Sequence, residues 1–273
     1  MIRFDNIVKR LGGRNVLDGL SFEIRTGEVF VIVGPSGTGK SVTLRHMVQL
    51  LRPTSGTVWV DDVAASEVDG DELEKLRERF GYLFQGGALL TWLTVAENVA
   101  LPLQEKTDLP EDEIARRVQE ALEMVDLAEA ADQYPSEISG GMQKRAGLAR
   151  AIVRRPEIVL YDEPTSGLDP VTARTIDRLI QHLNRNLGVT SVVVTHEMDS
   201  AFRIADRMAM LDKGKMLKVA TRAEYEAIRD SKPGGDEMHD LIRQFLRGES
   251  EGPITRRRLD TGYAEDILEA AGH

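Results

Sequence analysis

Residues 29–47 decide the fold, and they read VFVIVGPSGTGKSVTLRHM. The first five are apolar and mostly β-branched, which is typical of a buried strand. A glycine-rich loop follows, and after it the apolar residues take the spacing of a helix. The segment is therefore predicted to run strand, loop, helix, which is the setting that a phosphate-binding loop requires.

The loop matches the phosphate-loop pattern in full. Its glycines let main-chain N–H groups curl around phosphate oxygens, and the start of the helix adds its positive end. Lys40 is predicted to reach the terminal phosphates and Ser41 to offer a hydroxyl to Mg²⁺. A glycine-rich turn that binds nothing would need neither the pattern nor this context. The predicted nucleotide-binding residues are Gly34, Pro35, Ser36, Gly37, Thr38, Gly39, Lys40, Ser41 and Val42.

Two more apolar runs, residues 158–161 and 191–195, are predicted to be buried strands of the same parallel sheet. The first run ends in Asp162 and Glu163, at the edge where such sheets bind ligands. Asp162 is predicted to hold Mg²⁺, and Glu163 to orient or deprotonate an attacking water. An acidic pair alone is more often a solvated strand end, but the phosphate loop favours the functional interpretation.

The rest of the chain suggests an α/β domain with additions. Alternating apolar residues before residue 25 predict a small antiparallel β layer. Residues 86–155 have helical patterns and are predicted to form a helical insertion, with a core-facing stripe. A break at residues 231–235 precedes a short predicted helix, so the expected domains are 1–230 and 231–273. The stripe consists of Ala115, Val118, Leu122 and Val125.

Composition excludes several classes of protein. The chain has 273 residues, no cysteine and a net charge of −10, which argues against disulfides and against a broad nucleic-acid surface. Its apolar runs are far shorter than the ~20 residues of a spanning helix, and its N-terminus lacks the layout of a signal peptide. The expected location is the cytoplasm.

Residues 138–143, Ile-Ser-Gly-Gly-Met-Gln, resemble the signature motif of ABC ATPases, and the resemblance extends from Phe4 to about Leu246. It implies a glutamine loop at Gln85, which joins Mg²⁺ coordination and senses the membrane partner. It also implies a D-loop at residues 166–169 and a switch histidine at His196, which contacts the γ-phosphate and positions the water.

The resemblance implies an ATPase that uses ATP and Mg²⁺ and has the P-loop NTPase fold. That fold has a RecA-like parallel-sheet core, an antiparallel β subdomain and an inserted α-helical subdomain. In the family, Ser139, Gly140 and Gly141 of one subunit close over the phosphate loop of the other, so a homodimer is expected. Two departures stand out: residues 9–11 lack the usual adenine-stacking aromatic, and Met142 replaces the usual glutamine.

A narrower resemblance, carried by residues 85–90, 101–105 and 243–246, is to the MlaF-type ATPases of Mla and Mce lipid-transport systems. It implies an MlaE-like permease, an MCE-domain lipid-binding protein, in some members a STAS-domain regulator, and a peripheral place on the cytoplasmic face of the bacterial inner membrane. The permease is expected to contact residues 89–95. The C-terminal tail either crosses to the second subunit or is a solvated end, and Arg256-Arg257-Arg258 is expected to be a solvated face.

Three alternatives remain open. The first is an ABC transporter ATPase for another cargo. The second is a soluble ABC ATPase acting on DNA or ribosomes, which would need a second cassette, a long coiled-coil insertion or a basic face, and the sequence shows none of these. The third is a degenerate cassette that binds ATP only as a switch, which the presence of Glu163 and His196 opposes.

Overall fold

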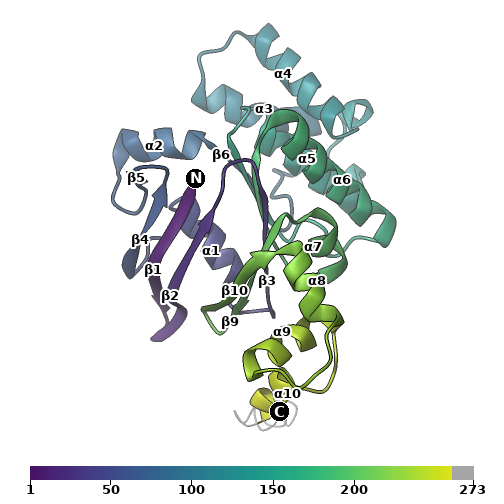
Figure 1. Ribbon diagram of the computed structural model, residues 1–273. Coiled ribbons are helices and arrows are strands. Elements are labelled where there is room, and N and C mark those ends of the chain that lie inside the picture. The colour runs from purple at the N-terminus through teal and green to yellow at the C-terminus, as the bar shows by residue number, and fades with distance from the viewer. Residues whose placement is uncertain (260–273) are drawn as a thin grey trace, which may run out of the picture. The chain divides into compact units, whose positions relative to one another are not determined.

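The computed structural model describes residues 1–259 (Figure 1). The chain divides into a larger compact unit, from Met1 to Val219, and a smaller one that begins at Ala220. The smaller unit begins before the boundary expected at residue 231, because a helix at residues 222–230 packs with the helix that follows it.

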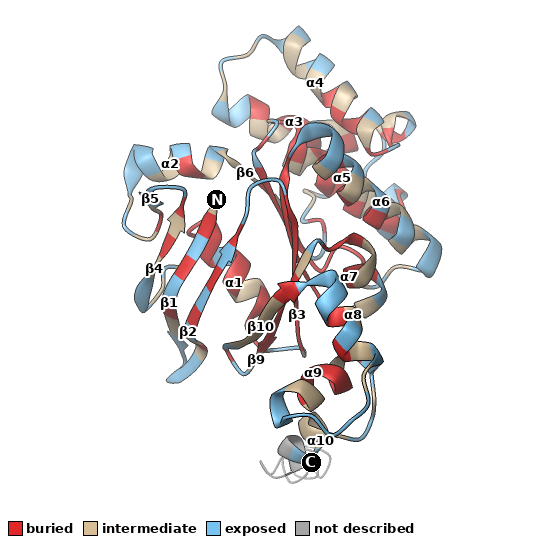
Figure 2. Cartoon of the chain, viewed as in Figure 1, coloured by how far each residue is buried: buried red, intermediate tan, exposed pale blue. Residues whose placement is uncertain are grey.

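A mainly parallel sheet forms the centre of the larger unit. Its strand order is β10 (Lys215–Thr221), β9 (Arg207–Asp212), β3 (Val29–Val33), β8 (Thr190–Thr195), β7 (Ile158–Asp162) and β6 (Phe80–Leu83). β3, β8 and β7 are parallel neighbours, and all their residues are buried (Figure 2). The strands predicted from the three apolar runs are thus confirmed, since apolar runs of this kind are covered on both faces.

A smaller antiparallel sheet confirms the predicted β layer. Its order is β2 (Arg14–Ile24), β1 (Ile2–Leu11), β4 (Ser55–Val60) and β5 (Val63–Ala64). Helix α1 (Lys40–Met47) contacts strands of both sheets and buries Leu44 and Met47 in the core that they share. The phosphate loop is therefore anchored by a buried strand before it and a buried helix after it.

The remaining helices of the larger unit cover the parallel sheet or form the insertion. α5 (Gly140–Ile152) contacts β6, α6 (Pro170–Leu187) contacts β8, α7 (Met198–Ile204) contacts β3, and α2 (Gly70–Glu78) contacts β6. α3 (Val95–Lys106) and α4 (Glu111–Met124) pack with each other and with α5, and short 3₁₀ turns lie at Ala128–Ala130 and Pro135–Glu137. None of the helices in the described part of the chain combines the length and apolar composition needed to cross a bilayer.

The predicted apolar stripe on α4 is wrong at its first residue. Val118, Leu122 and Val125 are buried as expected, but Ala115 is exposed. Ala115 lies near the start of α4, where it lines an open groove of about 300 Å³ between α3 and α4. The stripe therefore meets the core only from Val118 onward.

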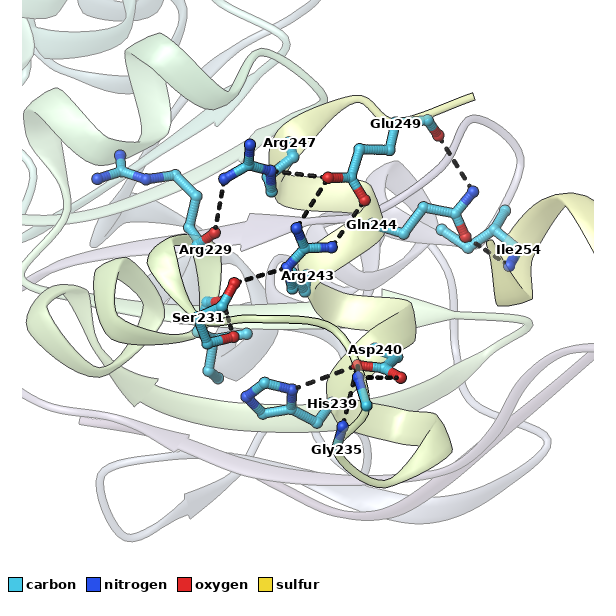
Figure 3. Close-up of polar contacts among 12 residues, drawn as sticks. Arg229, Ser231, Gly235, His239, Asp240, Arg243, Gln244, Arg247, Glu249 and Ile254 are labelled. Atoms are coloured by element: carbon cyan, nitrogen blue, oxygen red, sulfur yellow. Dashed lines mark hydrogen bonds and ion pairs between the residues drawn. The ribbon is translucent and has the colours of Figure 1, made fainter. Parts of the chain in front are cut away.

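In the smaller unit, α9 (Glu237–Arg247) packs with α8 (Arg222–Asp230) and α10 (Pro253–Leu259), and side-chain hydrogen bonds link the segments around it (Figure 3). Arg243 Nε donates to the carbonyl of Ser231 at 2.9 Å, and its two terminal nitrogens reach the Glu249 carboxylate at 2.8 and 2.9 Å. Arg247 donates to the same carboxylate. The tail was expected either to cross to a second subunit or to be a solvated end, and its residues beyond 259 lie outside the described part of the chain, as do the side chains of Arg257 and Arg258.

His46 is a buried titratable group from which we expect a pH dependence of the folding stability. Its ring is buried on α1, with Nδ1 2.6 Å from the Val42 carbonyl, and Nε2 has no hydrogen-bond partner in the described residues. Burial lowers the pKa of His46 below its usual 6.5; the Val42 hydrogen bond opposes this shift and the charge of Lys9 adds to it. The unfolded chain therefore takes up the proton first, and this contribution to stability is complete above pH 6.5 and is lost as the pH falls below it.

We expect His46→Leu to flatten the pH dependence of the free energy of unfolding by at most about 1.4 kcal/mol per pH unit, the value for one proton. Urea unfolding between pH 7.5 and pH 5.5 measures the slope. His182→Leu, at an exposed histidine of α6, is the control and should leave the slope unchanged. Equal slopes for the wild type and His46→Leu would contradict this account.

Candidate functional site

The phosphate loop has a backbone that only glycine can follow at two of its positions. Gly34 has φ +153°, and a Cβ there would lie 2.1 Å from the carbonyl oxygen of Leu211. Gly39 has φ +103°, and a Cβ there would lie 2.8 Å from Leu17 and 3.0 Å from the carbonyl of Val16. The loop is thus pressed between β9 and β2, which fixes its main-chain N–H groups in place.

Lys40 is buried at the start of α1 and faces both the loop and the acidic strand end. Its Nζ donates to the carbonyls of Gly34 and Pro35 at 2.9 and 3.1 Å, and lies 3.7 Å from Glu163 Oε1. Burial lowers the pKa of Lys40, and the carboxylates of Glu163 and Asp162 oppose that shift. The Lys40 ammonium is therefore shared between two main-chain carbonyls and the Glu163 carboxylate.

The Asp162 carboxylate is held at both oxygens. Ser41 Oγ donates to Oδ1 at 2.7 Å, and the hydroxyl of Tyr82, on β6, donates to Oδ2 at 3.2 Å. Burial and the charge of Asp162 raise the pKa of Tyr82, so its hydroxyl remains a donor. Tyr82 also stacks on Phe84 with ring centroids 4.2 Å apart. The sequence patterns gave no signal for Tyr82, because its partner is 80 residues away.

Glu163 and His196 meet at the ends of β7 and β8. His196 Nδ1 lies 2.9 Å from Glu163 Oε2, and the main-chain N–H of His196 donates to the same oxygen at 3.3 Å. Glu163 is buried and has φ +50°, an uncommon conformation for a residue with a side chain. Its carboxylate thus lies between a histidine and the phosphate-loop lysine, a place from which it can accept a proton.

These residues share one cavity of about 310 Å³. It brings together six of the nine predicted residues of the phosphate loop with the predicted catalytic residues, and it adds Val16, which no sequence pattern indicated. Asp162 joins through Ser41. Within residues 1–259, no three His, Cys, Asp or Glu side chains gather into a metal cluster. The lining residues are Val16, Ser36, Gly37, Gly39, Lys40, Ser41, Val42, Gln85, Glu163 and His196.

The segment Ser139–Gly141 does not line this cavity. Ser139 caps α5 by accepting the N–H of Met142 at 3.3 Å, and Gly140 opens the helix. A Cβ at Gly141 would lie 2.4 Å from Cγ2 of Thr172 on α6, whereas a Cβ at Gly140 would meet nothing within 4 Å. Packing inside the chain thus requires a small residue at 141 and leaves the surface at 140 open.

Residues 9–11, where an adenine-stacking aromatic was expected, make contacts on the surface of the β layer instead. Lys9 Nζ donates to the Arg52 carbonyl at 2.5 Å, and Arg10 Nε donates to Asn15 Oδ1 at 3.0 Å. Neither they nor Leu11 line the cavity. Val16 could have been found from the sequence only by knowing that β2 passes beside Gly39.

Comparison with known proteins gives a family match over the site. The family model described as ABC transporter matches residues 17–166. The chain is 40% identical to a probable ribonucleotide transport ATP-binding protein, mkl, of Mycobacterium leprae, covering 100% of this chain and 77% of that protein. It is 36% identical to the intermembrane phospholipid transport ATP-binding protein MlaF of Haemophilus influenzae, covering 98% of each. It is 47% identical to the methionine import ATP-binding protein MetN of Carboxydothermus hydrogenoformans, covering 74% of this chain and 60% of that protein.

Among solved structures, the chain resembles the dimeric ATP-binding cassette MJ0796 in a post-hydrolysis state bound to ADP and Pi. The TM-score is 0.76 at 36% identity, with 81% of this chain and 99% of that chain covered. The likeness supports the expected fold, with its parallel core, β layer and helical insertion.

Proposed function

Because this chain belongs to the ABC transporter family, as an ATPase that uses ATP and Mg²⁺, we propose that it drives a lipid transporter from a nucleotide site shared by two copies. The observation that carries the catalytic part is the Glu163 carboxylate, held between His196 and Lys40 at the phosphate loop. The cargo and the two-copy site are argued separately below.

The nucleotide's phosphates bind in the loop at residues 34–41, where Lys40 moves from carbonyl partners to phosphate oxygens. The site fits Mg²⁺: Ser41 Oγ and Asp162 Oδ1 lie 2.7 Å apart, near the separation of about 2.9 Å between adjacent ligands of an octahedral Mg²⁺. Gln85, which lines the same cavity, completes the protein's share. The cation supplies charge that offsets the developing charge on the phosphates.

Glu163 acts as general base toward the water that attacks the γ-phosphate. His196 keeps the Glu163 carboxylate in place and reaches the γ-phosphate with its other ring nitrogen. In place of an aromatic ring, Val16 gives the nucleotide an aliphatic surface at the cavity wall. The adenine of the nucleotide is then held by van der Waals contact with an aliphatic side chain rather than by aromatic stacking.

The two-copy site is supported by the N-terminus of α5, which does not line the chain's own nucleotide cavity. Gly140 faces open surface at the start of α5, away from the chain's own cavity, and helix N-termini attract phosphate. Ser139, Gly140 and Gly141 of one copy therefore cover the nucleotide held by the phosphate loop of the other. The similar cassette MJ0796 is itself dimeric, which supports a site built from two copies.

The lipid cargo is supported by the full-length similarity to the MlaF protein, which covers nearly all of both chains. The partners are then an MlaE-like permease and an MCE-domain lipid-binding protein, with a STAS-domain regulator as a further partner, at the cytoplasmic face of the membrane. We place the permease contact on residues 89–95, where Trp92 is 70% exposed. The similarity to methionine and ribonucleotide transport proteins favours other cargoes as the second candidate.

The neighbouring reading frames and the proteins that co-purify with the tagged chain test the cargo. An MlaE-like permease and an MCE-domain protein would support lipid transport. A permease for amino acids or nucleotides would contradict it and leave the ATPase assignment in place.

Lys40→Ala should weaken MgATP binding by about 10- to 100-fold, since buried charge-assisted bonds to phosphate are worth roughly 1.5–3 kcal/mol each. Isothermal titration calorimetry measures the affinity. Lys106→Ala, at a surface ion pair on α3, is the control and should bind as the wild type does. Unchanged affinity in Lys40→Ala would count against the phosphate loop as the nucleotide site.

A further inference from the structure

Lys144 is a buried cation on α5 that the chemistry described above does not use. Its side chain is only 7% exposed. Its Nζ donates to two main-chain carbonyls, that of Glu163 at 3.1 Å and that of Ser166 at 2.6 Å. Burial lowers the pKa of Lys144, which the more distant carboxylates of Glu197 and Glu163 partly oppose. Burying an ammonium on carbonyls alone is costly, so the contact needs a reason.

The two carbonyls are the ends of the turn that carries the predicted base. The N–H of Ser166 donates to the Glu163 carbonyl at 3.3 Å, which closes residues 163–166 into a turn. On its other side, the N–H of Glu163 donates to the Val194 carbonyl of β8 at 3.0 Å. Glu163 itself has φ +50°. Its backbone is therefore fixed by β8 before it and by Lys144 after it.

Glu163 lies in the left-handed region of backbone conformation, although β-region and right-handed conformations are lower in energy for a residue with a side chain. Its backbone therefore needs contacts that prevent it from relaxing to them. Relaxation at Glu163 would rotate its carboxylate away from Lys40 and His196. Two charge-assisted bonds from one ammonium oppose that rotation at both ends of the turn. A neutral apolar side chain of the same length could fill the space but could not hold the carbonyls.

We infer that Lys144 is a positioning residue for Glu163, holding the turn at residues 163–166 so that the carboxylate stays over the phosphate loop. The inference rests on the proposed role of Glu163 as general base. Lys144 also connects Glu163 to α5. The first residue of α5 is Gly140, which in the proposed two-copy site faces the nucleotide bound by the other copy.

The first test is Lys144→Met, which keeps an unbranched side chain as far as the position of Cε and removes the ammonium. We expect kcat for ATP hydrolysis to fall about 10- to 100-fold, the usual effect of a misplaced catalytic group, with KM for ATP changed by less than about threefold. Lys144→Arg, which restores a cation with several donors, should recover most of the loss. MgATP affinity from calorimetry verifies that each variant is folded.

Arg145→Met is the matched control. Arg145 follows on the same helix and also holds two main-chain carbonyls, those of Val125 and Asp126, but these lie in the helical insertion. The variant should lose stability and keep its kcat. If Arg145→Met and Lys144→Met lower kcat equally, the effect belongs to α5 as a whole and the inference is overturned.

A double-mutant cycle with Glu163→Gln separates positioning from other roles. If Lys144 acts through Glu163, adding Lys144→Met to Glu163→Gln should cause no further loss of single-turnover rate. A full additional loss would overturn the inference, as would a wild-type kcat in Lys144→Met. Should Lys144→Met fail to bind MgATP, Lys144→Gln carries the same tests. Normal turnover in Glu163→Gln alone would instead sink the proposed base, which keeps the two failures distinguishable.

Discussion

Glu163→Gln is expected to lose about 10²- to 10⁴-fold in steady-state ATP hydrolysis, the share that a positioned general base contributes. The amide has nearly the shape of the carboxylate and can still accept the N–H of His196, but it cannot take a proton from water. The phosphate loop is untouched, so MgATP binding should persist. With hydrolysis blocked, the form in which two copies enclose nucleotide should accumulate.

Steady-state phosphate release, calorimetry and size-exclusion chromatography with MgATP measure these three consequences. Glu28→Gln is the matched control, because Glu28 is another buried carboxylate of the larger unit, paired with Arg207 and absent from the cavity lining. It should lower stability and leave turnover near that of the wild type. Ordinary turnover in Glu163→Gln would show that the proton goes elsewhere.

The core of the fold could be predicted because its signals are local. Residues 29–47 contain strand, loop and helix in one continuous segment. The later strands β7 and β8 are each indicated by a short apolar run. Parallel strands with both faces buried place their carboxyl ends together, so the meeting of Glu163 with the phosphate loop followed from the sheet.

The remaining contacts of the site could not be predicted, because they join residues far apart that no pattern pairs. Tyr82 reaches Asp162 across neighbouring strands, and Lys144 reaches Glu163 from a helix on the sheet's face. A tyrosine in a strand and a lysine in a helix are too common to indicate such partners. The register of β6 on β7 and the rotation of α5 about its axis decide both contacts.

Helix α8 has a local start signal in its sequence that does not depend on apolar periodicity. Thr221 accepts the N–H of Glu224 at 3.3 Å and the Glu224 carboxylate accepts the N–H of Thr221 at 2.8 Å, which is a capping box. Apolar periodicity is weak in this segment, so that pattern alone does not indicate the helix. At Ala115 the opposite happened: the periodicity was present, but α4 begins outside the core.

Gly140→Asp is expected to abolish hydrolysis while leaving the fold intact, and this combination tests the two-copy site. A side chain at 140 meets nothing within the chain, and an acidic residue in the first turn stabilises a helix by about 0.3–1 kcal/mol. Folding stability should therefore be unchanged or slightly higher. In the shared site, however, the new carboxylate would face the phosphates bound by the other copy.

Like charges brought together at an interface cost several kcal/mol, which corresponds to at least a roughly 100-fold loss of hydrolysis. Calorimetry should still find MgATP bound to the chain's own phosphate loop, whereas the dimer that accumulates in Glu163→Gln should disappear when Gly140→Asp is added. Ala223→Asp places the same charge in the first turn of α8, at an exposed position, and should affect neither property.

Gly140→Asp distinguishes a site shared by two copies from a site complete within one chain, because stability, nucleotide affinity and turnover are all measured on this one variant. Lost turnover with retained affinity means that each copy binds nucleotide alone and needs Gly140 of the other to hydrolyse it. Wild-type turnover in Gly140→Asp would mean that the cavity around Lys40 and Glu163 is complete within one chain, and the shared site would have to be abandoned.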